Sequence, residues 1–244
     1  MNRFYIDQNP GETEELFLAE EDVHHARDVL RLKPGQPLEI ILSGRRYAAV
    51  IADMSGGRVR LERKDPLPTT EAALAVTLFQ GLPKGDKMEW IIQKAVELGV
   101  ARIVPVQMKR SVVRLTPRDL PKKTERWSKI AREAGKQSGR CVLPEVLSPV
   151  FLPQVLSLCS ELDATAVPWE SCRTVGPKAF FGSHPGLTSL GIVIGPEGGI
   201  APEEIALLEQ AGCSPITLGP RILQTETAGL AAVSAFLSLY GEME

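Results

Sequence analysis

The chain has 244 residues, of which 43% are hydrophobic and 24% are charged, and its formal net charge at pH 7 is −2. This length suits one large domain or a small domain joined to a larger one, and the composition is that of an ordinary globular protein. The first residues lack the basic and then apolar pattern of an export signal, and no stretch approaches the roughly 20 apolar residues of a membrane span. We therefore expect neither export nor membrane insertion.

The chain has four cysteines, which are widely spaced and form no CxxC pair. This spacing argues against a metal site and favours buried, reduced thiols in the cytoplasm. The four are Cys141, Cys159, Cys172 and Cys213.

Charge is distributed unevenly along the chain. Residues 1–101 carry a formal charge of −3, residues 102–140 carry +9 and residues 141–244 carry −8. A basic segment of this kind is suited to a phosphate backbone, although a solvated helix face with no partner gives the same pattern. The basic residues that define the segment are Lys109, Arg110, Arg114, Arg118, Lys122, Lys123, Arg126, Lys129, Arg132, Lys136 and Arg140.

The N-terminal part, up to about residue 68, consists of short segments separated by turn signals. We predict strands at 16–18, 38–42, 47–51 and 58–62, and one helix from Glu20 to Leu32. Short strands between glycine-containing turns are typical of a small β-barrel or sandwich. Pro66 and Pro68 then indicate a linker.

After the linker the pattern changes to alternating strands and helices. In the first helix, residues 88–96 place apolar side chains at spacings of three and four, and Gly99 stands where a helix C-cap glycine belongs. A second, basic helix is expected at 122–137. Strands are predicted at 74–79, 102–106, 163–168, 190–194 and 215–218, and this alternation implies a mostly parallel α/β sheet.

Two of these strands run into unusual loops. Gly195 to Gly199 follows the strand at 190–194, and Leu218 to Glu226 follows the strand at 215–218. Ligands bind at the carboxyl ends of parallel strands, and glycines let a backbone approach them closely. The first loop matches neither the dinucleotide-binding pattern nor the P-loop, so a tight turn without a ligand stays open as its alternative.

The last predicted helix, residues 228–240, is apolar on nearly every side. Such a helix is buried in the core or in a subunit interface. The loop that leads into it is therefore held firmly.

Three motifs together resemble one known family. They are IGPEGG at 194–199, LGPRILQTETA at 218–228 and QKAVELGV at 93–100, and they resemble the RsmE family, the 16S ribosomal RNA (uracil-N3)-methyltransferases. Supporting matches are His24-His25 with Val29-Leu30-Arg31, and Glu125-Arg126-Trp127 with Glu133-Ala134 and Gln137-Ser138-x-Arg140.

This resemblance implies a PUA-like, RNA-binding β-barrel in residues 1–70 and a SPOUT methyltransferase domain in residues 71–244. The SPOUT domain would be an α/β domain with a mostly parallel sheet and a deep trefoil knot, which is rare among protein folds. The implied cofactor is S-adenosylmethionine, and the implied substrate is 16S rRNA, free or within the small ribosomal subunit. A cytoplasmic homodimer without a metal is implied as well.

The family's functional residues carry over position by position. The implied cofactor residues are Pro168, Ile194, Gly195, Pro196, Glu197, Gly198, Gly199, Leu218, Gly219, Ile222, Leu223, Thr225 and Glu226. The implied RNA-binding residues are His25, Arg31, Lys94, Arg110, Arg126, Arg132, Gln137 and Arg140. Among catalytic candidates, Glu197 and Glu226 are possible bases and Arg221 a stabiliser of developing charge. A structural role for both glutamates, as acceptors of backbone N–H groups, is the alternative.

One position departs from the family pattern, because Gln224 stands where a second arginine is usual. Glutamine keeps hydrogen-bonding capacity but lacks the charge and the five donors of arginine. This departure motivates one alternative, and the range of substrates that the SPOUT fold serves leaves a second one open. One is a catalytically impaired RNA- or ribosome-binding factor, and the other is a SPOUT methyltransferase that acts on another RNA or on a ribose 2′-OH.

Overall fold

A computed structural model describes residues 1–6 and 15–243 of the chain. The chain divides into two compact units, Met1–Glu71 and Ala72–Glu244. Within the described residues, no helix is long and apolar enough to cross a membrane.

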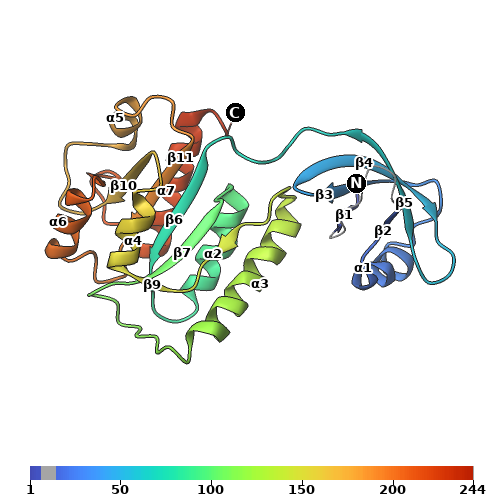
Figure 1. Ribbon diagram of the computed structural model, residues 1–244. Coiled ribbons are helices and arrows are strands. Elements are labelled where there is room, and N and C mark those ends of the chain that lie inside the picture. Colours follow the sequence, from blue (N-terminus) through green and yellow to red (C-terminus); the bar gives the residue numbers. More distant parts are fainter. Residues whose placement is uncertain (7–14, 244) are drawn as a thin grey trace. The chain divides into compact units, whose positions relative to one another are not determined.

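The first unit is a curled five-stranded sheet in the order β1-β3-β4-β5-β2, with one short helical segment (Figure 1). Strand β1 pairs parallel with β3, and the other pairings are antiparallel. Its elements are β1 (Arg3–Ile6), β2 (Leu16–Phe17), α1 (Glu20–His24), the π-helical turn η1 (His25–Val29), β3 (Pro37–Leu42), β4 (Arg45–Asp53) and β5 (Arg60–Pro66).

The small β-domain expected from the sequence is thus confirmed, with two differences in detail. The helix predicted from Glu20 to Leu32 changes from α to π geometry at His25. Strand β1 was not predicted, because its four residues give too short an alternation to stand out. Buried aliphatic side chains on β3 and β4, such as Leu38, Ile40 and Ile51, form the core of this unit.

The second unit is built on a parallel sheet in the order β12-β10-β11-β6-β7-β8, with β9 pairing to β7. The predicted mostly parallel sheet is therefore confirmed. The elements are β6 (Ala75–Gly81), α2 (Lys87–Leu98), β7 (Arg102–Gln107), α3 (Leu120–Ser138), β8 (Glu145–Val146), β9 (Val150–Phe151), α4 (Leu152–Cys159), β10 (Ala164–Pro168), α5 (Pro177–Gly182), β11 (Ser189–Ile194), α6 (Pro202–Gln210), β12 (Ser214–Ile216) and α7 (Thr225–Tyr240).

Helices cover both faces of this sheet (Figure 1). Neighbouring strand residues point to opposite faces, so that Leu78 packs on the side of α2, α3, α5 and α7, while Phe79 packs on the side of α4 and α6. The closing helix α7 contributes Val233 and Phe236 to the first of these cores. The expectation that α7 is buried in a core is confirmed for this side of the helix.

The parallel direction of the strands decides where a site can form. Strands β6, β10, β11 and β12 all run the same way, so their carboxyl ends meet at one edge of the sheet. Two connections leave the sheet at this edge. We call residues 195–201, between β11 and α6, the first loop, and residues 217–224, between β12 and α7, the second loop.

Candidate functional site

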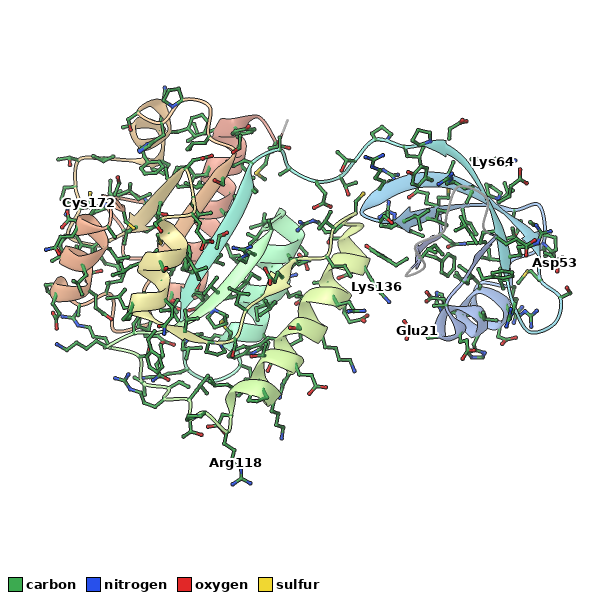
Figure 2. The ribbon with its side chains drawn as sticks, viewed as in Figure 1. Glu21, Asp53, Lys64, Arg118, Lys136 and Cys172 are labelled. Carbon is green, nitrogen blue, oxygen red and sulfur yellow. The ribbon has the colours of Figure 1, made fainter. Side chains whose placement is uncertain are left out.

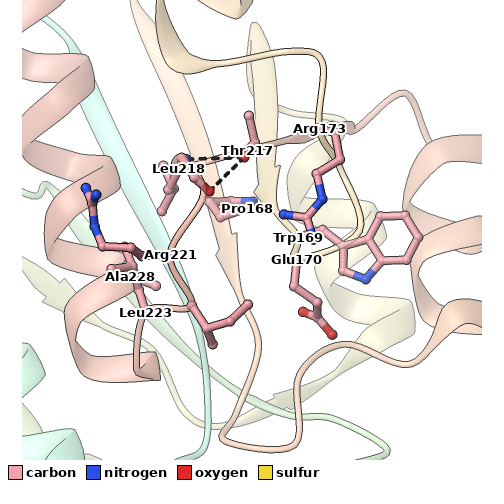
Figure 3. Close-up of a pocket in the computed structure, with 11 residues that line it drawn as sticks. Pro168, Trp169, Glu170, Arg173, Thr217, Leu218, Arg221, Leu223 and Ala228 are labelled. Atoms are coloured by element: carbon pink, nitrogen blue, oxygen red, sulfur yellow. Dashed lines mark hydrogen bonds between the residues drawn. The ribbon is translucent and has the colours of Figure 1, made fainter.

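A cleft lies at the carboxyl ends of β10, β11 and β12. One part of it is bordered by the second loop and by the residues that follow β10, and Figure 3 shows Arg221 and Glu170 on opposite sides of this part. The other part is bordered by Lys87, the first loop and the start of α7. The two parts form one continuous cleft, because they share Pro168, Glu170, Ile222, Leu223 and Ala228.

The structure brings the two loops together as the sequence predicts. Of the thirteen residues expected to hold a cofactor, all but Glu226 line the cleft. The exception lies directly beside it, in contact with the lining residue Lys87. Glu170, which follows β10, also lines both parts of the cleft.

Close packing fixes the first loop against the end of β6. A Cβ atom added to Gly81 would lie 2.6 Å from the Pro196 nitrogen, and one added to Gly195 would lie 2.8 Å from Ile200 Cγ1. Both distances are too short for a real carbon atom. Gly199 has a φ of 71°, in the left-handed region that glycine tolerates best. The glycines are therefore required by the path of the backbone.

A buried threonine, Thr225, links the start of α7 to the first loop. Gln80 Nε2 donates a hydrogen bond to Thr225 Oγ1 at 2.8 Å, and Thr225 Oγ1 donates to the Gly195 carbonyl at 2.6 Å. Both side chains are buried. The end of β6, the first loop and the start of α7 are thus joined through one hydroxyl group.

An ion-pair cluster closes the same end of the cleft. Lys87 Nζ lies 2.9 Å from a Glu226 carboxylate oxygen and 3.7 Å from Glu197 Oε1. The Glu197 carboxylate also accepts a hydrogen bond from the Lys84 backbone N–H at 3.0 Å. Both expected bases therefore have structural partners. The contact between Glu197 and the Lys84 backbone N–H is of the kind that a purely structural role for this glutamate predicts.

The ionisation of this cluster follows from its contacts. Burial alone would raise the pKa of Glu226, but the hydrogen bond from Lys87 and a backbone hydrogen bond outweigh it and hold the pKa below its usual value. The hydrogen bond to Glu226 in turn raises the pKa of Lys87. At neutral pH the pair is ionised, and a carboxylate with a lowered pKa is a weaker base.

Lys87 was not predicted from the sequence, although a signal for it exists. It is the first residue of α2, where the helix dipole disfavours a positive charge. A lysine at that position is stabilised when carboxylates lie opposite, as Glu197 and Glu226 do here.

The second loop begins with a tight turn. Thr217 Oγ1 accepts a hydrogen bond from the Gly219 backbone N–H at 3.2 Å, and Gly219 has a φ of 102°. No other atom lies within 4 Å of a Cβ built on Gly219, so a side chain there would enter the open cleft. Farther along the loop, Ile222 is 76% exposed and Arg221 is exposed.

The basic connection after β7 contacts the first loop. Arg110 Nη1 donates a hydrogen bond to the Gly198 carbonyl at 3.1 Å, and a Cβ on Gly198 would lie 3.0 Å from Arg110 Cβ. The predicted RNA residue Arg110 therefore sits at the rim of the cleft.

Helix α3 presents most of the remaining basic residues to solvent. Trp127 and Ala131 pack inward, whereas Arg132 and Gln137 are exposed. Figure 2 shows Arg118, just before the helix, projecting away from the body of the second unit. The exposed basic side chains on or just before the helix are Arg118, Lys122, Arg126, Lys129 and Arg132.

The other predicted RNA residues have different surroundings. Arg126 forms an ion pair with Glu89 at 2.7 Å, and Lys94 pairs with Glu97 at 2.9 Å. In the first unit, His25 and Arg31 are exposed.

Arg140 differs from the other predicted RNA residues, because its side chain is buried. It is only 5% exposed, and its Nη1 donates hydrogen bonds to the carbonyl oxygens of Val96 and Val100, at 3.1 and 3.0 Å. These carbonyls belong to the C-terminal end of α2 and the residue after its cap, where a cation is favourable. The side chain of Arg140 is thus engaged at the end of α2, and its contact with RNA stays a prediction.

No group of three His, Cys, Asp or Glu side chains suited to a metal ion occurs in residues 1–6 and 15–243. The four cysteines carry no disulfide, and three of them are buried.

Comparison with known proteins gives the relationship of the whole chain. The profile described as RNA methyltransferase domain matches residues 70–237, and the profile described as RNA methyltransferase PUA domain matches residues 18–62. The ribosomal RNA small subunit methyltransferase E of Bacillus subtilis (strain 168) is 37% identical, over 96% of this chain and 95% of its own length.

Solved structures agree with this relationship. The ribosomal RNA small subunit methyltransferase E of Neisseria gonorrhoeae, bound to S-adenosyl methionine, superposes with a TM-score of 0.80 at 32% identity and covers 98% of both chains. A methyltransferase of Legionella pneumophila with bound S-adenosyl methionine gives a TM-score of 0.78 at 30% identity, over 97% of both chains. The fold class expected from the sequence, a PUA-like β-domain and a SPOUT α/β domain, is confirmed. The chain belongs to the RNA methyltransferase family that includes ribosomal RNA small subunit methyltransferase E, the RsmE family.

Proposed function

We propose that this protein transfers a methyl group from S-adenosylmethionine to N3 of a uridine in 16S ribosomal RNA, and that it acts in the cytoplasm, where its substrate is made. The observation that carries the proposal is the convergence of the first and second loops in one cleft at the carboxyl ends of the strands. The relatives that share this fold over almost the whole chain support it.

The residues of the cleft fit the proposed cofactor. Gly195, Gly198 and Gly199 bring backbone close to the cleft, and Gly219 leaves its side open. Apolar side chains suited to an adenine ring come from Leu218 and Leu223. Three carboxylates suit a cofactor with a positively charged sulfur, those of Glu170, Glu197 and Glu226.

When bound, S-adenosylmethionine supplies an electrophilic methyl group on a positively charged sulfur. The protein's task is then to present an unpaired uracil, because N3 lies on the edge of the base that a duplex hides. It must also remove the proton from N3 and stabilise the negative charge that develops on the uracil carbonyls.

We assign the charge stabilisation to Arg221, since this exposed side chain borders the cleft and a guanidinium offers several donors. Glu197 and Glu226 stay the two candidates for proton acceptor. Glu197 is the more accessible, with 26% of its side chain exposed against 17% for Glu226. Separate Glu197→Gln and Glu226→Gln variants distinguish them. A general base makes kcat rise with pH as the base is deprotonated, and the variant that lacks the true acceptor should no longer show this rise.

For the RNA we propose a two-part interface, with the expected RNA-binding domain, residues 1–70, as one part. The second part is the basic surface of residues 71–244, formed by Arg110, Arg126, Arg132 and Gln137, with Lys94 on the neighbouring helix α2. His25 and Arg31 are the corresponding residues of the first unit. Phosphate contacts of this kind make affinity depend steeply on salt.

We also propose that the working form is a homodimer in which each subunit completes the other's site. Ile222 at the cleft and Leu239 on α7 are exposed by 76% and 37%, and such apolar side chains suit a subunit contact. Light scattering of the purified protein tests this, with a monomer at micromolar concentration as the contrary result.

The deciding experiment uses small ribosomal subunits and free 16S rRNA from a strain that lacks this modification. Each is incubated with the protein and S-adenosylmethionine, digested to nucleosides and analysed by mass spectrometry. We expect 3-methyluridine in at least one sample. A 2′-O-methylated nucleoside would establish the ribose alternative. Cofactor binding without any methylated nucleoside, or no cofactor binding in calorimetry, would favour the impaired factor that Gln224 suggests.

A further inference from the structure

We propose that Lys87 is a positioning residue for the cofactor, because it ties the first loop, through Glu197, to the start of α7, through Glu226. This inference rests on the proposed function, since it concerns the site for S-adenosylmethionine. Its test is chosen so that the two can fail separately.

Three separate elements meet at this lysine. Lys87 comes from the first turn of α2, Glu197 from the first loop and Glu226 from the first turn of α7. The ammonium group lies 2.9 Å from Glu226 and 3.7 Å from Glu197. The side chain is only partly exposed, at 38%, so the ion pairs are shielded from water on one side.

The ion pairs of Lys87 and the hydroxyl of Thr225 connect the same two elements, the first loop and α7. Thr225 joins the first loop to α7 from the buried side, through the Gly195 carbonyl. Lys87 joins the same two elements from the cleft side. The loop and the helix are thus held at two points, and the distance between them sets the width of the cofactor cleft.

The charged groups around Lys87 explain why it is needed. Without it, the Glu197 and Glu226 carboxylates would face each other with no cation between them. The other charged side chains of the cleft are Glu170, Arg173 and Arg221, and within the described residues none of the three forms an ion pair with either glutamate. Repulsion between the two carboxylates would push the loop from the helix, or one of them would take up a proton.

The test measures S-adenosylmethionine binding by calorimetry in the absence of RNA, with wild type, Lys87→Met and Lys87→Arg. We expect Lys87→Met to weaken binding about tenfold at pH 7.5, a typical coupling between neighbouring groups. Lys87→Arg should recover most of the affinity, because it restores the cation. Lys178→Met, on the exposed surface of α5, is the matched control for loss of a lysine.

Two further readouts separate positioning from a general structural role. The affinity of wild type should stay constant between about pH 8 and pH 5, whereas that of Lys87→Met should rise as the pH drops through this range, because protonation of one glutamate relieves the repulsion. In methylation assays with RNA, Lys87→Met should raise the KM for the cofactor, and Lys87→Arg should restore it.

Glu226→Gln removes the same ion pair without changing Lys87 and should also weaken cofactor binding, so it tests the tie in case Lys87→Met is unstable. If the tie is as proposed, the double variant Lys87→Met/Glu226→Gln binds no more weakly than Lys87→Met alone. A wild-type protein that does not bind the cofactor would overturn the proposed function and this inference together. A wild type that binds, with a Lys87→Met variant of the same affinity and pH dependence, would overturn only the role of Lys87.

Discussion

The hydroxyl of Thr225 donates a hydrogen bond to the carbonyl oxygen of Gly195 across 2.6 Å. These residues are thirty positions apart in the sequence, and each begins a segment that borders the proposed cofactor cleft. Because Gln80 donates to the same hydroxyl, the end of β6 takes part in this junction as well.

Thr225→Val should loosen this junction while preserving its shape. The variant leaves the Gly195 carbonyl and one Gln80 donor without their partner, and an unsatisfied buried polar group costs about 1–3 kcal/mol. We expect a lower free energy of unfolding in urea and weaker S-adenosylmethionine binding. Thr225→Ser keeps the hydroxyl and serves as the control. If Thr225→Ser is the more damaging of the two, packing of the methyl group matters more than the hydrogen bond.

Gly81→Ala should be destabilising for a different reason. The new Cβ would lie 2.6–2.8 Å from backbone and ring atoms of Gly195 and Pro196, so the first loop would have to move. Overpacking of this kind costs about 1–3 kcal/mol. Urea unfolding measures the loss, and cofactor titration shows whether the cleft is altered. Gly182→Ala, at a helical position with no atom within 4 Å, is the matched control and should change stability little.

The sequence predicted the helices and strands around this cleft because their patterns are long and regular. Residues 88–96 repeat at helical spacing and Gly99 ends the helix, as the structure confirms with a φ of 107°. Two-residue strands such as β8 and β9 have no such period and were missed. The knot was implied by the family resemblance, since a local pattern contains no information about threading.

For the site, the sequence showed which loops matter but could not show which partners their side chains have. The sequence left Glu197 and Glu226 open between a base and an acceptor of backbone N–H groups, and only the fold brings Lys87 between them. Arg140 looked like one more member of a basic segment. Its side chain is held by the end of α2, about forty residues earlier in the sequence. A count of charges along the chain contains no information about such a contact.

Arg140→Met should therefore affect stability and leave RNA affinity unchanged. The variant keeps much of the side-chain volume but leaves the carbonyls of Val96 and Val100 without their charged donor. Hydrogen bonds to charged groups contribute about 1.5–3 kcal/mol, so we expect a loss of that order in urea unfolding. RNA binding is then measured without urea, under conditions in which the variant is fully folded. A large loss of RNA affinity in a fully folded variant would support the predicted contact of Arg140 with RNA.

Asp163 should make stability depend on pH at the acidic end. Hydrogen bonds from Thr188, and then from Ser189, lower the pKa of this carboxyl to about 2. In the unfolded chain the pKa is about 3.9, so the folded state favours the ionised form. The stabilisation is complete above about pH 4 and is lost as the pH falls toward 2. In thermal unfolding between pH 7 and pH 2, Asp163→Asn should therefore have a lower Tm than wild type at pH 7 and approach it near pH 2. A constant difference at all pH values would contradict this account.

The basic face of α3 should contribute to RNA binding through charge, and its contribution is measurable as a salt slope. Lys129 and Arg132 are exposed on this face, and no ion pair is recorded for either within the described residues. Replacing both with glutamine removes up to two phosphate contacts, each of which contributes about 0.7–0.9 to the slope of log affinity against log salt concentration. We expect the slope to fall by about 1.5 and the affinity to drop most at low salt. Lys178→Gln, on the exposed surface of α5, controls for the loss of one positive charge away from this face. An unchanged slope in the double variant would remove α3 from the RNA interface and leave the first unit, Arg110 and Lys94 of α2 as its remaining parts.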